Sequence, residues 1–395
     1  MTGVSGRRIL AVNPSADLYG SDRVFLDAIR SLRGSGASVE VILPGHGRLA
    51  ERLRADAVPV RIAGFPVLRR SLLSPRPLAA LAAQAWPTVR GLAASIRSMA
   101  PDVVYVNTIT LPHWMAAGRK AGAGVICHVH ELDQLPGPLA SVLLSPLLLA
   151  DRLVVNSQAT QRYVRSRLPR VGSRVSLVHN GFDMTATLPP PPAFGRTRRL
   201  LLVGRLSPRK GQDLAIKALS LLVQRGHDVV LELAGDTFDG YEWYEEALRR
   251  QAVSLGLADR VEFSGYRTDT SSAYAKADVV LVPSALESFG NVAVEGLAAG
   301  RPVLATAVGG LPEIVEHGVN GFLFPAGDAA ALAAWAGHLL SDPAKATVMG
   351  AQGARAVRAR FGKDRFAQGM SAAVASVSHR TVREAAPQVV SPTSR

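Results

Sequence analysis

The chain has 395 residues, of which 48% are hydrophobic and 19% charged, and its formal net charge is +14. This composition is too apolar for general disorder, and the length suits two to three domains with their own cores. The apolar stretch 143–150 is interrupted by Ser145 and Pro146, and no apolar run in the sequence approaches the roughly 18 residues of a spanning helix, so we expect no segment to cross a bilayer. A single cysteine, Cys127, excludes an internal disulfide framework and a Cys-based zinc cage.

Positive charge is concentrated in the first half of the chain. Residues 1–188 hold 22 Lys and Arg against 11 Asp and Glu, a net charge of +11, whereas residues 189–395 hold 23 against 20, a net charge of +3. Arg outnumbers Lys, and Ala and Gly are abundant, so the base composition of a GC-rich genome is an alternative explanation of this excess. Aromatic residues, at 6%, are too few for a nucleic-acid surface. We therefore expect no nucleic-acid partner, whereas anionic lipid headgroups and a phosphorylated substrate remain open.

The first half alternates short β-branched runs with helical patterns. Strands are expected at 8–13, 39–44, 58–63, 103–107, 124–130, 153–157 and 175–180. Between them, segments such as 22–32, 78–99 and 159–168 have the apolar spacing of helices packed on a sheet. This alternation predicts a parallel sheet with helices on both faces, in a Rossmann-like domain over residues 1–188.

A run of four prolines, 189–192, can extend neither a helix nor a central strand and predicts the domain boundary. Further strands are expected at 200–204, 229–234, 261–264, 279–283, 302–306 and 322–324, and helices at 212–224, 244–255, 291–298 and 329–340. They predict a second doubly wound domain, 189–363, then a helix at 364–380, with packing on the first domain as an option, and a disordered tail, 381–395. Two such domains leave a ligand cleft between the carboxyl ends of their strands.

Cationic side chains follow the first strand of the second domain. The loop carries Arg205, Arg209 and Lys210 between Gly204 and Gly211, and a helix begins directly after it. Backbone N–H groups, the positive end of the helix dipole and the cations then meet at one spot, which suits a diphosphate. The pattern is not a Walker A loop, and no Gly-x-Gly-x-x-Gly joins a strand to a helix. A solvated basic turn is the alternative for this loop taken alone.

Two glutamates with seven residues between them, Glu287 and Glu295, follow the strand at 279–283. The apolar residues around Glu295 predict that it lies in a helix of the sheet layer, where an unpaired carboxylate is costly, so we expect a polar partner. Gly290 lets the backbone approach a ligand closely. A bare spacing of two glutamates also fits an exposed helix residue and a loop carboxylate.

Seven segments occur in the order that a known family has. They are 201–211, 233–236, 261–266, 287–295, 298–303, 309–313 and 318–321. Together they closely resemble the donor-binding domain of retaining glycosyltransferases of family 4, which have the GT-B fold. The resemblance is specific over 199–328 and weaker in the first domain, at 101–105, 128–131, 154–157 and 179–181. One departure stands at Tyr19-Gly20-Ser21-Asp22, where such enzymes commonly have a Gly-Gly-Ala-Glu-like loop.

The resemblance implies two α/β domains facing across a cleft, which bind a nucleotide-sugar and an acceptor. It assigns Arg205 and Lys210 to the diphosphate of the donor and Glu295 to the two ribose hydroxyls. Other donor-binding positions that it implies are Glu287, the backbone of Ser288, Phe289 and Gly290, and Asn291 near the transferred sugar and phosphates, Tyr266 near the base, and Gly20. No Asp-x-Asp pair is present, and since two cations can neutralise the diphosphate, we expect metal independence and no cofactor beyond the nucleotide-sugar.

The histidines of the first domain have different expected roles. His130, at the end of a strand, matches the family's histidine that lines the cleft near the transferred sugar, so it joins Glu287, Arg205 and Lys210 as a candidate catalytic residue. A histidine hydrogen-bonded in the core is the alternative. His128 lies deeper on the same face of the strand and is expected to be structural, as are His179 and Asn180, and Cys127 points to the opposite face.

The leading hypothesis is a retaining glycosyltransferase that acts on a glycan, a lipid-linked or a small-molecule acceptor. A nucleotide-sugar epimerase or phosphorylase of the same fold and a non-catalytic nucleotide-sugar-binding protein are the alternatives. The apolar stretch after Arg7 and Arg8 is only 9–12, too short for a secretory signal, so the cytoplasm is the expected compartment. Basic and apolar residues meet at 68–73 and around 139–149, which suits peripheral contact with the inner membrane face; a buried helix with a solvated rim is the alternative.

Overall fold

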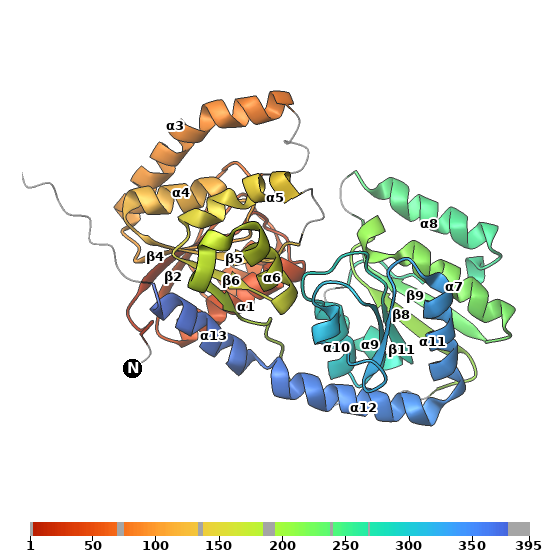
Figure 1. Ribbon diagram of the computed structural model, residues 1–395. Helices are drawn as coiled ribbons and strands as arrows, with labels where there is room; N and C mark the ends of the chain where they lie inside the picture. The colour runs from red at the N-terminus through yellow and green to blue at the C-terminus, as the bar shows by residue number, and fades with distance from the viewer. Residues whose placement is uncertain are drawn as a thin grey trace, which may run out of the picture.

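A computed structural model describes residues 3–68, 75–132, 137–184, 194–237, 240–267 and 269–377. The described residues form two parallel β-sheets, each flanked by helices, in two domains that lie beside one another (Figure 1). Side chains of both domains, such as Tyr19 and Tyr266, line a cavity in the cleft between them. The predicted fold class, two Rossmann-like domains in a GT-B arrangement, is confirmed. The proline run at the expected boundary and the expected tail lie outside the described residues.

The N-terminal sheet has seven strands in the order β3-β2-β1-β4-β5-β6-β7. The strands are β1 (Arg8–Val12), β2 (Ser38–Leu43), β3 (Val60–Ile62), β4 (Val103–Asn107), β5 (Gly124–Val129), β6 (Arg152–Val155) and β7 (Val175–Leu177). Its helices are α1 (Gly20–Gly34), α2 (Arg48–Ala55), α3 (Pro75–Met99), α4 (Pro112–Ala121), α5 (Gly137–Leu144) and α6 (Gln158–Arg167). Strands β4 and β5 are buried along their whole length, as expected of a parallel sheet covered on both faces.

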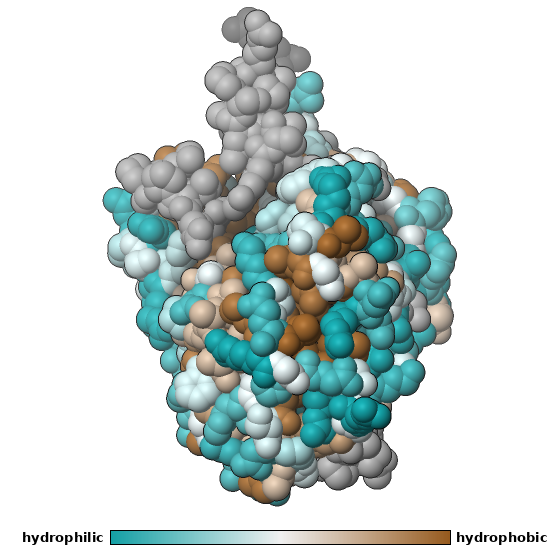
Figure 2. All heavy atoms as spheres, turned by 90° about the vertical axis from the view of Figure 1, so that its right-hand side faces the viewer, coloured by the Kyte–Doolittle hydropathy of each residue, from teal (hydrophilic) through white to brown (hydrophobic). Residues whose placement is uncertain are grey.

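The C-terminal sheet has six strands in the order β10-β9-β8-β11-β12-β13. The strands are β8 (Arg198–Val203), β9 (Val229–Ala234), β10 (Val261–Phe263), β11 (Val279–Val282), β12 (Val303–Thr306) and β13 (Gly321–Phe324). Its helices are α7 (Gln212–Gln224), α8 (Glu242–Ser254), α9 (Ser271–Lys276), α10 (Asn291–Ala298), α11 (Ala329–Ser341) and α12 (Pro343–Arg360). Figure 2 shows the outer end of this domain, where hydrophilic side chains cover most of the surface around a central hydrophobic strip.

Helix α12 was not predicted, because glycines interrupt its apolar pattern. The structure shows why they are needed. A Cβ on Gly350 would lie 2.0 Å from the carbonyl oxygen of Gly300, and one on Gly353 would lie 2.5 Å from the side chain of Leu297 in α10. The glycines therefore let α12 lie directly against α10 and the turn that follows it.

The chain returns to the N-terminal domain after α12. Helix α13 (Lys363–Ala375) lies beneath the N-terminal sheet and packs against α1 (Figure 1). Its side chains Phe366, Met370 and Val374 are buried in the same core cluster as Phe25 of α1. The last helix therefore ties the two domains together.

A carboxylate of one domain caps a helix of the other. Glu313, in a short 3₁₀ turn (Leu311–Glu313), accepts hydrogen bonds of 2.9 Å from the backbone N–H groups of Gln158 and Ala159 at the start of α6. His179 Nε2 lies 3.3 Å from the same carboxylate. An anion at a helix N-terminus satisfies N–H groups that have no partner within the helix and interacts favourably with the helix dipole. Glu313 therefore joins the two domains beside the cleft.

We expect Glu313→Ala to lower the free energy of unfolding by about 1 kcal/mol, typical for the loss of a helix cap, and to open the two domains. Urea unfolding measures the first effect and small-angle X-ray scattering the second. Asp328→Ala is the matched control, because Asp328 caps α11 within one domain by accepting from Ala331 N at 2.8 Å. Equal scattering by the two variants would contradict the interdomain role.

Candidate functional site

The loop after β8 is packed closely against the loop after β11. Gly211 has a φ of +72°, and a Cβ on it would lie 2.2 Å from the carbonyl oxygen of Pro283, so only glycine fits. The side-chain amide of Gln212, which begins α7, donates to the carbonyl oxygen of Arg205 at 3.0 Å. The loop between β8 and α7 is therefore held at both ends, with its cations beside the start of a helix.

An ion pair joins the two loops. Lys210 Nζ lies 2.6 Å from Oε2 of Glu287, and the two side chains are 25% and 13% exposed. The Ser284 hydroxyl lies 3.4 Å from the same carboxylate oxygen. The structure thus brings into contact two residues that lie 77 positions apart in the sequence, because both loops follow parallel strands whose carboxyl ends lie at one edge of the sheet.

The segment between Glu287 and α10 is shaped by glycines. Gly290 has a φ of +119°, and a Cβ on Gly309 of the neighbouring loop would lie 1.7 Å from the carbonyl oxygen of Glu287. The side chain of Phe289 is buried in the core of the domain. Ser288, Phe289 and Gly290 therefore lead into the N-terminus of α10, and the side chain of Phe289 contributes to the core rather than to the cleft.

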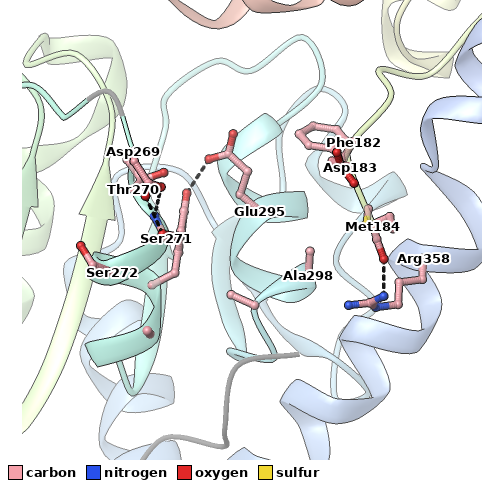
Figure 3. A pocket seen from close by; sticks show the side chains of 13 residues that line it. Phe182, Asp183, Met184, Asp269, Thr270, Ser271, Ser272, Glu295, Ala298 and Arg358 are labelled. Carbon is pink, nitrogen blue, oxygen red and sulfur yellow. Dashed lines mark hydrogen bonds between the residues drawn. The ribbon is translucent and has the colours of Figure 1, made fainter. Parts of the chain in front are cut away.

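Glu295 lies within α10, as predicted, and has the expected polar partner. The Tyr274 hydroxyl donates to its Oε2 at 2.7 Å, and Arg23 of the N-terminal domain lies 4.0 Å from Oε1. Burial raises the pKa of Glu295, although Tyr274 and Arg23 oppose the shift. A cavity of about 640 Å³ opens beside it, between Asp269–Ser272 on one side and Phe182–Met184 on the other (Figure 3).

The N-terminal domain contacts the start of α10 directly. The Asn180 side-chain amide donates to Oδ1 of Asn291 at 2.8 Å, and the Ser157 hydroxyl donates to the carbonyl oxygen of Ser288. A Cβ on Gly20 would lie 3.5 Å from Nδ2 of Asn291. Gly20 therefore lies across the cleft from the donor segment, the predicted donor-binding positions 287–291.

His130 ends a chain of buried hydrogen bonds. Its Nε2 lies 2.8 Å from Oδ1 of Asn107, whose amide donates to Oδ1 of Asn13 at 2.6 Å. The Asn13 amide in turn donates to Oδ1 of Asp22 at 2.9 Å. Because the Asp22 carboxylate only accepts, the amide N–H groups of Asn13 and Asn107 donate toward Asp22, and the side-chain oxygen of Asn107 is left to accept from His130. His130 must therefore carry its proton on Nε2. Burial lowers the pKa of His130 to about 3, so the ring is neutral at physiological pH.

An aromatic residue of the N-terminal domain lies on a predicted phosphate ligand. The guanidinium carbon of Arg205 is 3.7 Å from the centre of the Tyr19 ring. Tyr19 also lies edge-on to Tyr266, with the ring centres 5.8 Å apart. A second cavity, of about 300 Å³, is lined by Tyr19, Arg48, Asp236 and Tyr266 among others. Arg205, predicted to bind the diphosphate of the donor, and Tyr266, predicted to lie near its base, are thus both close to Tyr19.

The residues expected to be structural lie in the following places. His128 is buried with its Nδ1 2.8 Å from the Tyr105 hydroxyl, and Cys127 is buried in the sheet. His179 and Asn180 contact the second domain through Glu313 and Asn291. Among the described residues, no three His, Cys, Asp or Glu side chains gather as a metal site.

Several residues of this site were not predicted from the sequence. Asn13 and Asn107 were detectable in principle, because polar residues at the carboxyl ends of parallel strands face the ligand edge of the sheet. Glu313 lies in the family-like segment 309–313, but no role was predicted for it. Tyr274 and Arg23 gave no signal, because their contact with Glu295 depends on how α9 and α1 are packed.

Two family models match adjacent parts of the chain. Residues 19–186 match the model of glycosyltransferase family 4, and residues 186–356 match that of glycosyl transferases group 1. With two facing parallel sheets, these matches place the chain in a family of glycosyltransferases with the GT-B fold. The chain belongs to the family 4 type of these proteins, as its motifs predicted.

Among curated proteins, the chain is 34% identical over 253 residues to a D-inositol 3-phosphate glycosyltransferase of Thermobispora bispora. The match covers 59% of this chain and 58% of that relative. The chain is 32% identical over 271 residues to the protein of the same name from Streptomyces avermitilis, covering 61% and 58%. The match thus spans less than two thirds of these relatives.

Solved structures match over nearly the whole chain. Anabaena Alr3699/HepE in complex with UDP is 28% identical, with a TM-score of 0.79, and the match covers 93% of this chain and 100% of that one. The complex of the same protein with UDP-glucose is 27% identical, with a TM-score of 0.79, covering 94% and 100%. Sucrose-phosphate synthase from Thermosynechococcus elongatus, 23% identical with a TM-score of 0.72 and coverage of 93% and 98%, shares the fold.

Asp22 gives this site a pH-dependent stability. Burial raises its pKa from 3.8 to about 6, against the opposing hydrogen bonds from Asn13 and Tyr19. Between about pH 4 and pH 6 the folded protein holds a proton that the unfolded chain has released, so the free energy of unfolding falls as the pH rises through this window. At about 1.4 kcal/mol per pKa unit, the full loss is about 3 kcal/mol.

We expect Asp22→Asn to flatten the stability profile between pH 4 and pH 6, because the amide cannot titrate. Urea unfolding at a series of pH values measures it. Asp56→Asn is the control, since Arg30 lowers the pKa of Asp56 and its titration falls below this window. An unchanged slope in Asp22→Asn would show that another group titrates there.

Proposed function

We propose that the protein is a retaining glycosyltransferase that moves a sugar from a nucleotide-sugar to an acceptor held by the N-terminal domain. The observation that carries this proposal is the meeting of Lys210, Glu287 and the start of α10 at one point of the cleft, with Glu295 further along the same helix. Cations and backbone N–H groups suit a diphosphate, and a carboxylate can accept hydrogen bonds from two vicinal ribose hydroxyls. The UDP and UDP-glucose complexes of a structural relative support a uridine donor.

In this proposal Arg205 and Lys210 bind the diphosphate. As the bond between the sugar and the diphosphate breaks, negative charge grows on the leaving group, and cations fixed in advance stabilise the transition state more than the ground state. The same charges do the neutralising that a divalent metal does elsewhere, so the proposed reaction needs no metal. Lys210 is already fixed by its 2.6 Å contact with Glu287.

Glu287 and His130 face the transferred sugar in this proposal. When a diphosphate binds Lys210, it competes with the Glu287 carboxylate, which can then accept hydrogen bonds from sugar hydroxyls. The neutral His130 ring is suited to hydrogen bonding rather than to charge stabilisation. For retention, the leaving phosphate takes the acceptor proton on the face from which it departs, so the new bond forms on the side where the old one breaks.

Incubation with a panel of UDP-, GDP- and other nucleotide-sugars, with nucleotide release as the readout, tests the proposal. We expect release from one of them that rises when a suitable acceptor is added. Inositol phosphate is the first acceptor to try, because curated relatives carry the name D-inositol 3-phosphate glycosyltransferase. Tight nucleotide-sugar binding with no release under any acceptor would favour the non-catalytic alternative.

We expect Glu295→Gln to weaken UDP binding, because the ribose contact does not involve the sugar. Glu287→Gln should not weaken UDP binding, because the diphosphate already competes with that carboxylate for Lys210, but it should slow transfer about 100-fold. Calorimetric titration with UDP and a transfer assay separate the two roles. Glu246→Gln is a control for the substitution itself, because Glu246 is 70% exposed on α8. Equal losses of UDP affinity in the two site variants would contradict this division.

We also propose an anionic acceptor met at a membrane face, because the N-terminal half carries most of the positive charge. Helix α3 adds an exposed tryptophan, Trp86, with Lys120 Nζ 4.8 Å and the Arg90 guanidinium carbon 5.3 Å from its ring centre. Of the expected contact segments, 69–73 lies outside the described residues, and Leu144 and Leu147 are buried. No helix within the described ranges is both long and apolar enough to span a membrane.

We expect the protein to co-sediment with anionic vesicles at low salt and to be released by raised salt, since each basic residue near anionic headgroups contributes about 1 kcal/mol. Trp86→Ala should weaken this binding, and Trp243→Ala, at a similarly exposed tryptophan of the other domain, should not. Equal binding to neutral vesicles, or none at low salt, would show that the charge has no lipid target.

A further inference from the structure

Four side chains from both domains form one continuous stack beside the cleft. Arg205 lies on the Tyr19 ring at 3.7 Å, and Arg48 lies on the Tyr266 ring at 4.4 Å. The two rings meet edge to face, with centres 5.8 Å apart and planes at 78°. Tyr19 and Arg48 belong to the N-terminal domain, and Arg205 and Tyr266 to the C-terminal domain. In the order Arg205, Tyr19, Tyr266, Arg48, each residue belongs to the domain opposite its neighbour's. Each of the three contacts of the stack therefore joins the two domains.

The position of Tyr19 is fixed by its own loop. The residue precedes α1, and its backbone N–H donates to Oδ2 of the buried Asp22 at 3.1 Å. The Tyr266 hydroxyl donates to the carbonyl oxygen of Leu18 at 3.3 Å, which draws the neighbouring residue of the same loop toward the second domain. The ring that meets Arg205 is thus anchored from both sides of the cleft.

A ring on the face of a guanidinium positions that group without replacing its ligands. Cation–π contact uses the face of the planar group, whereas a phosphate is bound by the N–H groups in its plane. A guanidinium held on its face is therefore oriented before the phosphate arrives. Such orientation reduces the entropy lost on binding.

We propose that Tyr19 is a positioning residue that holds Arg205 for the donor diphosphate and, through Tyr266 and Arg48, joins the two domains over the nucleotide end of the cleft. This inference rests on the proposed function, because it takes Arg205 as a diphosphate ligand. Tyr19 occupies the position at which the loop of the family commonly has its first glycine, and a glycine at that position cannot make a cation–π contact.

Calorimetric titration with UDP tests the positioning role. We expect Tyr19→Leu to bind UDP about 3- to 30-fold more weakly, the range of a cation–π contact, and Tyr19→Phe to bind within about twofold of the unsubstituted protein, because the ring face remains. In an Arg205→Gln background, Tyr19→Leu should cause no further loss, because the two residues act through one contact. Tyr163→Leu, which removes a ring 5.9 Å from Arg167 on α6, is the matched control and should leave the affinity unchanged.

Three outcomes would overturn the positioning role while the proposed function stands. The first is a UDP affinity of Tyr19→Leu equal to that of the unsubstituted protein. The second is a higher affinity, which would mean that the ring competes with the diphosphate. The third is that Tyr19→Leu lowers the affinity as much in the Arg205→Gln background as it does alone. Failure of the unsubstituted protein to bind UDP would instead contradict the uridine donor and, with it, this use of Arg205.

A measurement without nucleotide decides the bridging role separately. In small-angle X-ray scattering we expect Tyr19→Leu to give a larger radius of gyration than Tyr19→Phe, because only the phenylalanine ring can still meet Arg205 and Tyr266. Identical scattering by the two variants would overturn the claim that the stack joins the domains, whether or not UDP binds.

Discussion

The ion pair between Lys210 and Glu287 is the contact on which the geometry of the site depends. It joins the loops that follow β8 and β11, and the two loops are pressed together at Gly211, where any side chain would meet the backbone carbonyl group of Pro283. The charges are therefore held in place by the backbone rather than by flexible side chains alone. In our account this is why a diphosphate meets a prepared site, with little reorganisation left for the moment of reaction.

The N-terminal domain completes this site from across the cleft. Glu313 caps α6, Ser157 holds the carbonyl group of Ser288, and Asn180 meets Asn291, so the donor segment is contacted by the opposite domain along its length. At the far side of the cleft, Tyr19 lies on Arg205. Contacts between the domains and contacts within the site are thus largely the same contacts, and opening the cleft changes both.

The sequence predicted most of the strands, the cleft and the two loops, because runs of β-branched residues, glycines and cations carry local signals. It predicted a polar partner for Glu295 but could not say that Tyr274 supplies it, since α9 reaches that carboxylate only through the fold. The chain from Asp22 to His130 was missed for the same reason. Its members come from three strand ends and a helix, and Asn13 and Asn107 lie 94 positions apart.

A crystal structure of the protein with UDP tests the central claim most directly. The account predicts the diphosphate within hydrogen-bond distance of Lys210 Nζ and the Arg205 guanidinium, with the ribose hydroxyls on the carboxylate of Glu295. It further predicts that the Tyr19 ring stays on Arg205. UDP bound elsewhere, with Lys210 still paired to Glu287 and no phosphate near either cation, would contradict it.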